Sequence, residues 1–404
     1  MIIKTANQAG GRVAKEFTIT NDTIEQPVSH ADPALGVFTE RVKLLIPAGV
    51  IKRPRVLFVM GGESALTDSA LIRFFRAYGK RNDMVVLCGE HRGYGTSISG
   101  ENQNRPAYVS VSEALADYHA VRQKYAERFP AEWIVCGRSY GGSLAISYAC
   151  AYPQDAAALL CSSGVTDWNA LLPEYDAAAR ENLGPALYER LCGHIDRLSP
   201  ADPFSEHWYD RELIYAFVTG ICQFREYRKL LPAVSAMAKL PTKRFVSAMK
   251  TADRLFAKGS AAQYADSNKA ATLSNGEACT CRYGWRVWRY QQAFELGTFW
   301  APSEQRSIYR RNAAEWKAEC RKLFGQDAPV FDAGVTWDVR DMVPKLNVPM
   351  IYVRGGRDPW RRVGLEEAYP LKNGTVVTIQ NGFHCPDSYP DTGPAIMETL
   401  LSYM

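Results

Sequence analysis

A serine stands in the middle of the short segment 137–141 (Gly-Arg-Ser-Tyr-Gly), in surroundings that suit nucleophilic chemistry. The apolar run 133–136 before it has the length and character of a strand buried on both faces of a parallel sheet. Small and helix-forming residues follow Gly142. A strand, a tight turn and a helix in this order expose a hydroxyl beside the free N–H groups of a helix N-terminus. We therefore predict that Ser139 is a nucleophile, and an unreactive serine in a tight turn is the alternative.

Two residues near the end of the chain complete the chemistry that a serine nucleophile needs. Asp358 follows a strand predicted over 349–354, and His384 follows a strand predicted over 375–380. The chain order serine, aspartate, histidine is that of an α/β-hydrolase. The histidine would take the hydroxyl proton and return it to the leaving group, and the aspartate would fix the imidazole tautomer. The expected substrate is an acyl compound: an ester, a thioester or an amide.

The oxyanion that forms during such a reaction needs N–H donors aimed at it. The backbone N–H of Tyr140 is one candidate. The second is expected from the loop at Gly62 and Glu63, because a glycine pair directly after the apolar run 56–60 lets backbone approach a substrate. An ordinary flexible loop is the alternative there. His91 precedes the serine and has charged neighbours, so we predict a structural role for it.

A sheet must position these residues. Short apolar runs alternate with helical patterns, which is typical of a parallel sheet covered on both faces. The predicted strands are 38–46, 56–60, 84–88, 133–136 and 157–161, and the predicted helices between them are 69–81 and 111–129.

The alternation stops near residue 167, the pattern is helical and irregular to about residue 340, and the alternation resumes after Asn347. The segment between is helical in pattern, with no convincing strand. We predict an α/β fold with a mostly parallel sheet. Its α/β-hydrolase core is expected in two parts, residues 1–166 and 341–404, and a helical cap over 167–340 is inserted before the strand of the acid.

Composition limits the partners and the location. The chain has 404 residues, 47% of them hydrophobic, and a net charge of +5 without a run of five basic residues, which argues against a nucleic-acid partner. No stretch reaches 18 apolar residues, so we expect no membrane span. The N-terminus shows no signal peptide, which predicts a cytoplasmic protein, or a secreted or periplasmic one if a signal has been removed.

Three of the ten cysteines, Cys88, Cys136 and Cys161, lie in predicted core strands, where a free thiol behaves as a small hydrophobe. This pattern favours a reducing compartment. The chemistry calls for no cofactor and no metal. A peptide or another small acyl compound is the expected partner, and a homodimer is left open.

Six segments of the chain form a recognisable set, and they resemble the prolyl carboxypeptidase and dipeptidyl peptidase II group of serine exopeptidases. Two N-terminal segments and the one at Asp358 are also similar to the bacterial tripeptidyl aminopeptidases. The resemblance runs from about residue 26 to 388. The segments are Gln26-x-x-x-His30-x-Asp32, Phe38-x-x-Arg41, Gly61-Gly62-Glu63, Glu90-His91-Arg92-x-Tyr94-Gly95-x-Ser97, Gly137-x-Ser139-Tyr140-Gly141-Gly142 and, in the predicted cap, Trp288-x-Tyr290-Gln291-x-x-x-Glu295-x-Gly297, with Gly356-x-Asp358-Pro359-Trp360 for the aminopeptidases.

The resemblance implies a serine exopeptidase whose cap restricts the cleft to chain ends, with Ser139 as nucleophile, Asp358 as acid and His384 as base. It implies release of di- or tripeptides from N-termini, often with a preference for proline. Ala293 departs from the cysteine that relatives often have there. An esterase, or an acyltransferase that joins or cyclises peptides, would use the same triad and is the alternative. A binding protein without activity is the least supported class, because the triad is complete.

The cap segment also permits an inference from spacing. If residues 285–299 are helical, Trp288, Gln292, Glu295 and Phe299 share one face. A carboxylate among aromatic rings is costly to bury unless a cation pairs with it.

We hypothesise that Glu295, together with Glu63, receives the free ammonium of a peptide substrate. Gln291, Trp288 and Trp360 would complete the substrate site. The alternative for Glu295 is a salt bridge to an arginine of the same segment, with Arg282, Arg286 and Arg289 as candidates.

Overall fold

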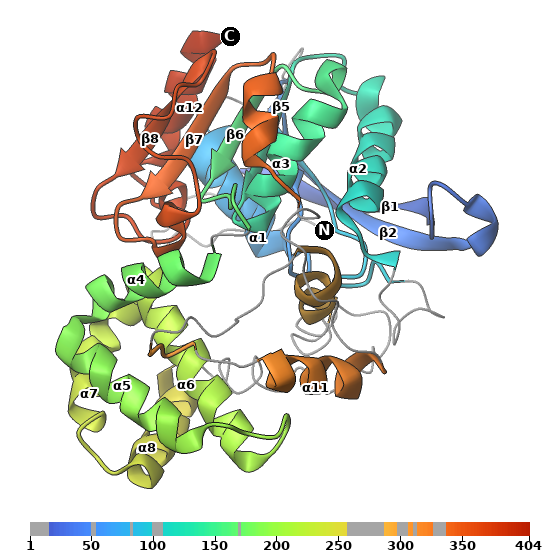
Figure 1. Cartoon of the computed structure of the whole chain (residues 1–404). Coiled ribbons are helices and arrows are strands. Elements are labelled where there is room, and N and C mark those ends of the chain that lie inside the picture. Colours follow the sequence, from blue (N-terminus) through green and yellow to red (C-terminus); the bar gives the residue numbers. More distant parts are fainter. Residues whose placement is uncertain are drawn as a thin grey trace, which may run out of the picture.

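Eight strands form a single sheet in the order β1-β2-β4-β3-β5-β6-β7-β8 (Figure 1). The first two strands run antiparallel to their neighbours, and β3 to β8 are parallel. The strands are β1 Phe17–Pro27, β2 Val37–Pro47, β3 Val56–Met60, β4 Val85–Gly89, β5 Trp133–Arg138, β6 Ala158–Ser162, β7 Met350–Gly355 and β8 Gly374–Ile379. This computed structural model describes residues 16–49, 54–80, 84–98, 108–168, 171–256, 287–296, 306–309, 313–325 and 337–404.

Strands β3, β4 and β6 are buried on both faces, and every residue in them is apolar or small. In β3, Val56, Phe58 and Met60 join the core on one face of the sheet. Leu57 and Val59 join the core on the other face. Alternate side chains of a strand point to opposite faces, so an unbroken apolar run is what a two-sided core requires.

Helices cover both faces of this sheet. On one face lie α2 (Val111–Ala126) and α3 (Tyr140–Ala151). On the other face lie α1 (Asp68–Phe74), which continues into a π-helical turn over Phe75–Gly79, and α12 (Gly393–Tyr403). The predicted α/β class and α/β-hydrolase architecture are confirmed.

The strand predictions agree with the structure to within one residue at most ends, with one omission. β1 was not predicted, because its alternation of Thr, Asn, Asp and Glu with single apolar residues leaves most of its side chains partly or fully exposed. It pairs with β2 over its whole length to form the hairpin that projects from the core in Figure 1. The helix predicted over 69–81 ends as an α-helix at Phe74.

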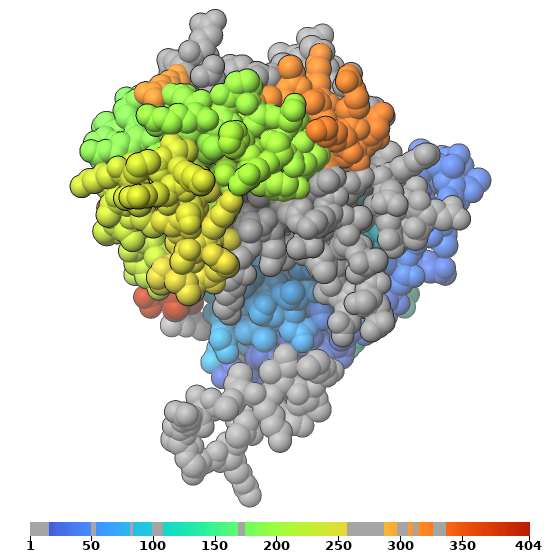
Figure 2. All heavy atoms as spheres, turned by 90° about the horizontal axis from the view of Figure 1, so that it is seen from below, coloured from blue at the N-terminus to red at the C-terminus, as the bar shows by residue number. Residues whose placement is uncertain are grey.

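After β6 the chain leaves the sheet and builds a layer of helices with an apolar core of its own, drawn below the sheet in Figure 1. Figure 2 shows this end of the molecule, with α5 to α8 in green to yellow and α11 in orange. The elements are α4 Leu171–Leu183, α5 Pro185–Leu198, α6 Glu206–Gln223, the 3-10 turn Arg225–Leu230, α7 Leu231–Met237, α8 Thr242–Phe256 and α11 Ala313–Phe324. Within the described parts of 167–340 all regular elements are helical, as expected of a cap.

Cys88, Cys136 and Cys161 are buried free thiols in β4, β5 and β6, as predicted. Across the described ranges, no helix combines the length and the apolar character needed to cross a membrane. The same ranges contain no cluster of three or more His, Cys, Asp and Glu side chains that could hold a metal ion.

Candidate active site

Ser139 lies in the turn between β5 and α3, and its backbone angles are φ 54° and ψ −129°. A residue with a side chain rarely adopts this region, and such strain is typical of the turn that presents a nucleophile. The two flanking glycines permit it. A Cβ at Gly137 would lie 1.9 Å from the carbonyl oxygen of Gly141, and a Cβ at Gly141 would lie 2.8 Å from the carbonyl oxygen of Met60.

His384 and Asp358 come together from two loops at the carboxyl edge of the sheet. The Nδ1 atom of His384 lies 2.8 Å from Oδ2 of Asp358. The other oxygen of Asp358 accepts a hydrogen bond from the backbone N–H of Trp360, at 3.0 Å, where the 3-10 turn Pro359–Arg362 begins. This carboxylate is therefore fixed from both sides, and Nε2 is the imidazole nitrogen available to take a proton.

The electrostatics of the pair favour a protonated imidazole. Burial opposes a charge on His384, but the negative charge of Asp358 and the neighbouring Cys385, together with their hydrogen bonds, outweigh that effect and raise the pKa of His384 well above its ordinary value. The side chains of His384 and Asp358 are only 8% and 1% exposed, so water screens this interaction weakly. Asp358 thus stabilises the imidazolium that forms when the neutral His384 takes a proton as general base.

Ser139 and His384 line the same cavity, which has a volume of about 600 Å³. Four more of the predicted site residues line it as well: Tyr140, Glu63, Trp288 and Trp360. The cap supplies much of the remaining wall through one face of α6, and these residues are Glu212, Tyr215, Ala216, Thr219, Gly220 and Gln223. These six candidates therefore lie in one cavity that the sheet edge and the cap line jointly.

The loop predicted to supply the second oxyanion donor lies beside the nucleophile turn. A Cβ placed on Gly62 would lie 3.5 Å from the backbone nitrogen of Gly141. Tyr118 donates a hydrogen bond to the carbonyl oxygen of Gly61 at 2.8 Å, which holds the loop in place. The position supports the assignment of donors to Tyr140 and to the Gly62–Glu63 loop.

The structure also shows that α6 contacts the loop of His384, which the sequence analysis did not predict. The backbone N–H of His384 donates to the carbonyl oxygen of Gln223, the last residue of α6, at 2.9 Å. The signal in the sequence was the set of small residues Ala216, Thr219 and Gly220 at helical spacing, which leaves room for a cavity beside α6. The cap therefore helps to position the base as well as to enclose the cavity.

Two of the predicted substrate-binding residues lie away from the cavity wall. Gln291 and Glu295 are not among the residues that line the cavity. Residues 287–291 are helical and continue into a π-helical turn over Gln292–Leu296, so the face expected from regular α-helical spacing does not extend to Glu295. The carboxylate of Glu295 instead accepts from the backbone N–H of Val111 and from Nε2 of Gln291, and burial raises its pKa to about 7.

The alternative offered for Glu295, a salt bridge to an arginine of its own segment, is not seen for Arg289. The guanidinium of Arg289 lies 3.1 Å from Glu212 and 3.6 Å from Glu319. Arg282, Arg286 and Phe299 lie outside the described residues.

Asp387 is a buried acid that sequence reasoning missed, although it stands three residues after His384. Its Oδ2 atom accepts from Nε of Arg138 at 2.5 Å and from the hydroxyl of Tyr78, and its Oδ1 atom accepts from Ser162. Arg138 directly precedes Ser139. Asp387 therefore joins the loop of the histidine to the turn of the nucleophile.

We expect the substitution Asp387→Asn to lower the free energy of unfolding by about 3 kcal/mol, because it leaves the largely buried guanidinium of Arg138 without its carboxylate. We also expect a lower kcat, because the two loops lose their common anchor. Denaturant unfolding and steady-state kinetics measure the two effects. Asp155→Asn is the matched control: Asp155 is also buried and accepts from Tyr148 and His119, but it is not among the residues that line the cavity. An Asp387→Asn variant with the kcat of the unaltered protein would contradict the positioning role.

Residues 50–184 match the model of a known family, serine carboxypeptidase S28. The match includes the Gly62–Glu63 loop, the Glu90-His91-Arg92 segment and the nucleophile turn, and it ends before most of the cap. A search of curated protein sequences finds no match to the chain.

Solved structures with similar chain traces include several hydrolases. A probable hydrolytic enzyme from Pseudomonas aeruginosa is 15% identical, with 95% of this chain and 94% of that chain covered and a TM-score of 0.44. A peroxisomal α/β-hydrolase from Saccharomyces cerevisiae is 12% identical, with 96% and 90% covered and a TM-score of 0.47. A proline iminopeptidase from Mycobacterium smegmatis is 12% identical, with 95% and 98% covered and a TM-score of 0.39.

The S28 match identifies the chain as a serine peptidase, a hydrolase that acts on peptide bonds.

Proposed function

We propose that this serine peptidase is an exopeptidase that releases di- or tripeptides from the N-termini of peptides through an acyl-enzyme on Ser139. Three features support the proposal: the cavity between the sheet edge and the cap, the carboxylate of Glu63 in its lining, and the aromatic walls next to the nucleophile. Each of them bears on a different part of the substrate.

The reaction begins when the hydroxyl oxygen of Ser139 attacks the scissile carbonyl carbon and Nε2 of His384 takes the hydroxyl proton. Asp358 holds Nδ1–H and stabilises the imidazolium. The N–H of Tyr140 and one from the Gly62–Glu63 loop stabilise the oxyanion. The C–N bond then breaks, and His384 gives its proton to the amine that leaves. The N-terminal fragment stays bound to Ser139 as an ester. Water, activated by the same histidine, hydrolyses that ester.

The cavity wall formed by α6 is as long as a short peptide. The lining face of α6 extends from Glu212 to Gln223, which is about 16 Å along a helix axis. An extended peptide of roughly four to five residues has the same length. Because cap helices form the far wall, a chain end enters this space more readily than the middle of a long chain does.

The position of Glu63 is the observation that favours cleavage from the N-terminus of a peptide. It lines the cavity, burial raises its pKa, and the positive charge of His384 is among the influences on it. Among the described residues no lysine or arginine forms an ion pair with it. A carboxylate in a mostly apolar cavity is costly to bury without a cation. His384 must be neutral before it can take the serine proton, and in that state the free ammonium of a peptide substrate would supply the positive charge.

The walls next to the nucleophile are aromatic. The ring of Trp360 lies 6.2 Å from the ring of His384, and the ring of Trp288 lies 5.2 Å from that of Tyr140. Flat apolar walls of this kind suit a compact apolar residue, and proline is the first to test.

We expect peptides with a free N-terminus to be cleaved about 10- to 100-fold faster in kcat/KM than their N-acetylated counterparts, the range that one charge-assisted contact provides. We expect Glu63→Gln to abolish most of this preference, because the amide cannot pair with an ammonium. Fluorogenic Xaa-Pro and Xaa-Ala dipeptides and tripeptides, each free and acetylated, measure it.

Glu295→Gln is the matched control, since Glu295 does not line the cavity, and the ratio of free to acetylated substrate should be unchanged in it. Equal cleavage of both substrate forms by the unaltered protein would refute N-terminal recognition. Turnover of simple acyl esters without any cleavage of peptides would favour the esterase, and new peptide bonds formed with added amines would favour the acyltransferase.

A further inference from the structure

The phenol of Tyr140 connects the nucleophile turn with the cap. Tyr140 is 1% exposed and follows Ser139 directly. Its hydroxyl oxygen lies 2.9 Å from Nε2 of Gln291 and 3.1 Å from Nε2 of His91. Gln291 belongs to the cap segment 287–296, and His91 follows β4 in the core. One side chain therefore bridges the two parts of the molecule directly behind the nucleophile.

The direction of each hydrogen bond follows from its partners. Nδ1 of His91 lies 2.7 Å from the carbonyl oxygen of Arg92, which only accepts, so Nδ1 carries the proton. Burial lowers the pKa of His91 to about 4, so the ring is neutral near pH 7 and its Nε2 accepts. The hydroxyl of Tyr140 therefore donates to His91 and accepts from Gln291.

Gln291 is held at each polar atom. Its Oε1 atom accepts from the hydroxyl of Tyr94 at 2.6 Å, and its Nε2 atom also reaches Glu295 at 3.3 Å. Gln291 is fully buried, so an unmade bond at either end would be costly. We call the side chains of Tyr140, His91, Gln291, Tyr94 and Glu295 the Tyr140 network.

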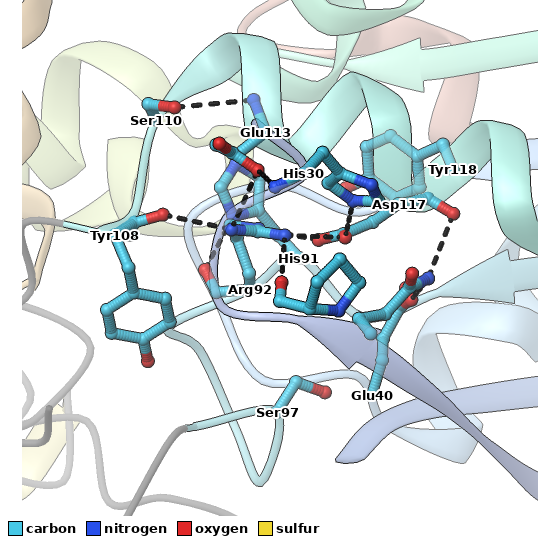
Figure 3. A network of polar contacts seen from close by, with 12 residues as sticks. His30, Glu40, His91, Arg92, Ser97, Tyr108, Ser110, Glu113, Asp117 and Tyr118 are labelled. Carbon is cyan, nitrogen blue, oxygen red and sulfur yellow. Dashed lines mark hydrogen bonds and ion pairs between the residues drawn. The ribbon is translucent and has the colours of Figure 1, made fainter. Parts of the chain in front are cut away.

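Helix α2 contacts both ends of the Tyr140 network. Glu295 accepts from the backbone N–H of Val111, the first residue of α2. Further along α2, Asp117 accepts twice from the guanidinium of Arg92, at 2.6 Å each, and Arg92 is the neighbour of His91. Figure 3 shows Arg92 between Asp117 and the carbonyl oxygen of Tyr108, with Glu113 beside it. Core and cap are thus anchored to the same helix on either side of Tyr140.

We propose that the hydrogen bond between Gln291 and Tyr140 positions the oxyanion hole, so that a cap residue that does not line the cavity controls the rate of the chemical step. Ser139 and its N–H neighbour Tyr140 stand at a strained turn, and such backbone keeps its geometry only when its surroundings hold it. The phenol, fixed from core and cap, supplies that restraint. Gln291 is a positioning residue, because it acts on the reaction through Tyr140.

The inference rests on the oxyanion and nucleophile roles in the proposed function, but not on its N-terminal preference. Its test therefore uses probes that report on Ser139 alone: a simple activated acyl ester and a fluorophosphonate that labels the nucleophile. Failure of N-terminal recognition would leave both probes informative. If the fluorophosphonate did not label Ser139 in the unaltered protein, the nucleophile assignment itself would be wrong.

We expect Tyr140→Phe and Gln291→Leu each to lower kcat for the ester by about 10- to 100-fold with little change in KM, the scale of a small misplacement at a reacting centre. The rate of fluorophosphonate labelling should fall in parallel. The double variant should be little slower than the slower single variant, since both substitutions break the same bond. Rates are expressed per titrated active site, so that a partly unfolded preparation does not imitate the effect.

Tyr148→Phe is the matched control. Tyr148 is buried on the same helix α3 and donates to Asp155 at 2.6 Å, so its loss removes a phenol hydrogen bond away from the nucleophile turn. It should lower thermal stability and leave kcat unchanged. The proposal is overturned if Tyr140→Phe and Gln291→Leu behave as Tyr148→Phe does, or if their effects on kcat are additive.

Discussion

The variant Ser139→Ala is expected to lose about 10⁶-fold in kcat, the effect of removing the nucleophile of a serine hydrolase. Alanine keeps the Cβ that the turn already accommodates, so the fold should be unchanged. Peptide and ester substrates should be affected alike, because both are attacked by the same oxygen. Steady-state kinetics with a fluorogenic peptide and with an acyl ester measure the loss, and circular dichroism verifies the fold.

Ser143→Ala serves as the control for this variant. Ser143 lies one turn further along α3, is fully buried, and donates to the carbonyl oxygen of Val165 at 2.7 Å. Its loss should cost roughly 1 kcal/mol of stability and leave fluorophosphonate labelling intact. If Ser139→Ala were labelled as fast as the unaltered protein, another residue would be the nucleophile.

The variant Asp358→Asn is expected to lower kcat by about 10⁴-fold, because the amide no longer holds the imidazole in the tautomer that presents Nε2 to the serine. Unlike alanine, asparagine fills the same volume and preserves the contact with the N–H of Trp360. The loss would therefore report on the charge and on the tautomer rather than on packing.

The same variant should change the pH dependence in a defined direction. His384 acts as a base only after it has lost its proton, so activity rises as pH increases through its pKa. Asp358 raises that pKa above the ordinary value of 6.5, so the acidic limb of kcat/KM should lie above pH 6.5 in the unaltered protein. Without the carboxylate the limb should move to lower pH, since burial disfavours the imidazolium and only the influence of Cys385 remains to favour it.

A pH profile of kcat/KM between about pH 5 and pH 9, measured for both proteins, distinguishes these outcomes. Asp155→Asn, which removes a buried carboxylate elsewhere, should leave the limb in place. If the acidic limb of kcat/KM lies at the same pH in Asp358→Asn as in the unaltered protein, Asp358 is not the partner that sets the pKa of His384.

Local rules were sufficient to predict the core strands and to place Ser139, Asp358 and His384 at one edge of the sheet. The run 56–60 is apolar at every position and only five residues long, which is the pattern of a strand buried on both faces. Ser139 could be recognised because the flanking glycines meet a steric requirement that is local to the turn. Asp358 and His384 followed because parallel strands bring their carboxyl ends to one edge of a sheet.

Other features depended on contacts that spacing along the chain does not encode. β1 exposes much of its surface, so its strand character came from pairing with β2 rather than from burial. Asp387 acts through Arg138, a residue 249 positions away. The π-helical turn over Gln292–Leu296 changed which side chains share a face, and Glu295 is not among the residues that line the cavity.

The amino-acid sequence alone determined the type of chemistry and the elements that carry it, because periodicity, turn sterics and the order of three residues are local properties. Only the tertiary structure decided which residues meet the substrate and which support them. Glu63 and Glu295 are the same residue type in segments that both resemble one family, yet one lines the cavity and the other caps α2. The difference arises from packing between the cap and the core, since a side chain's role depends on what lies opposite it.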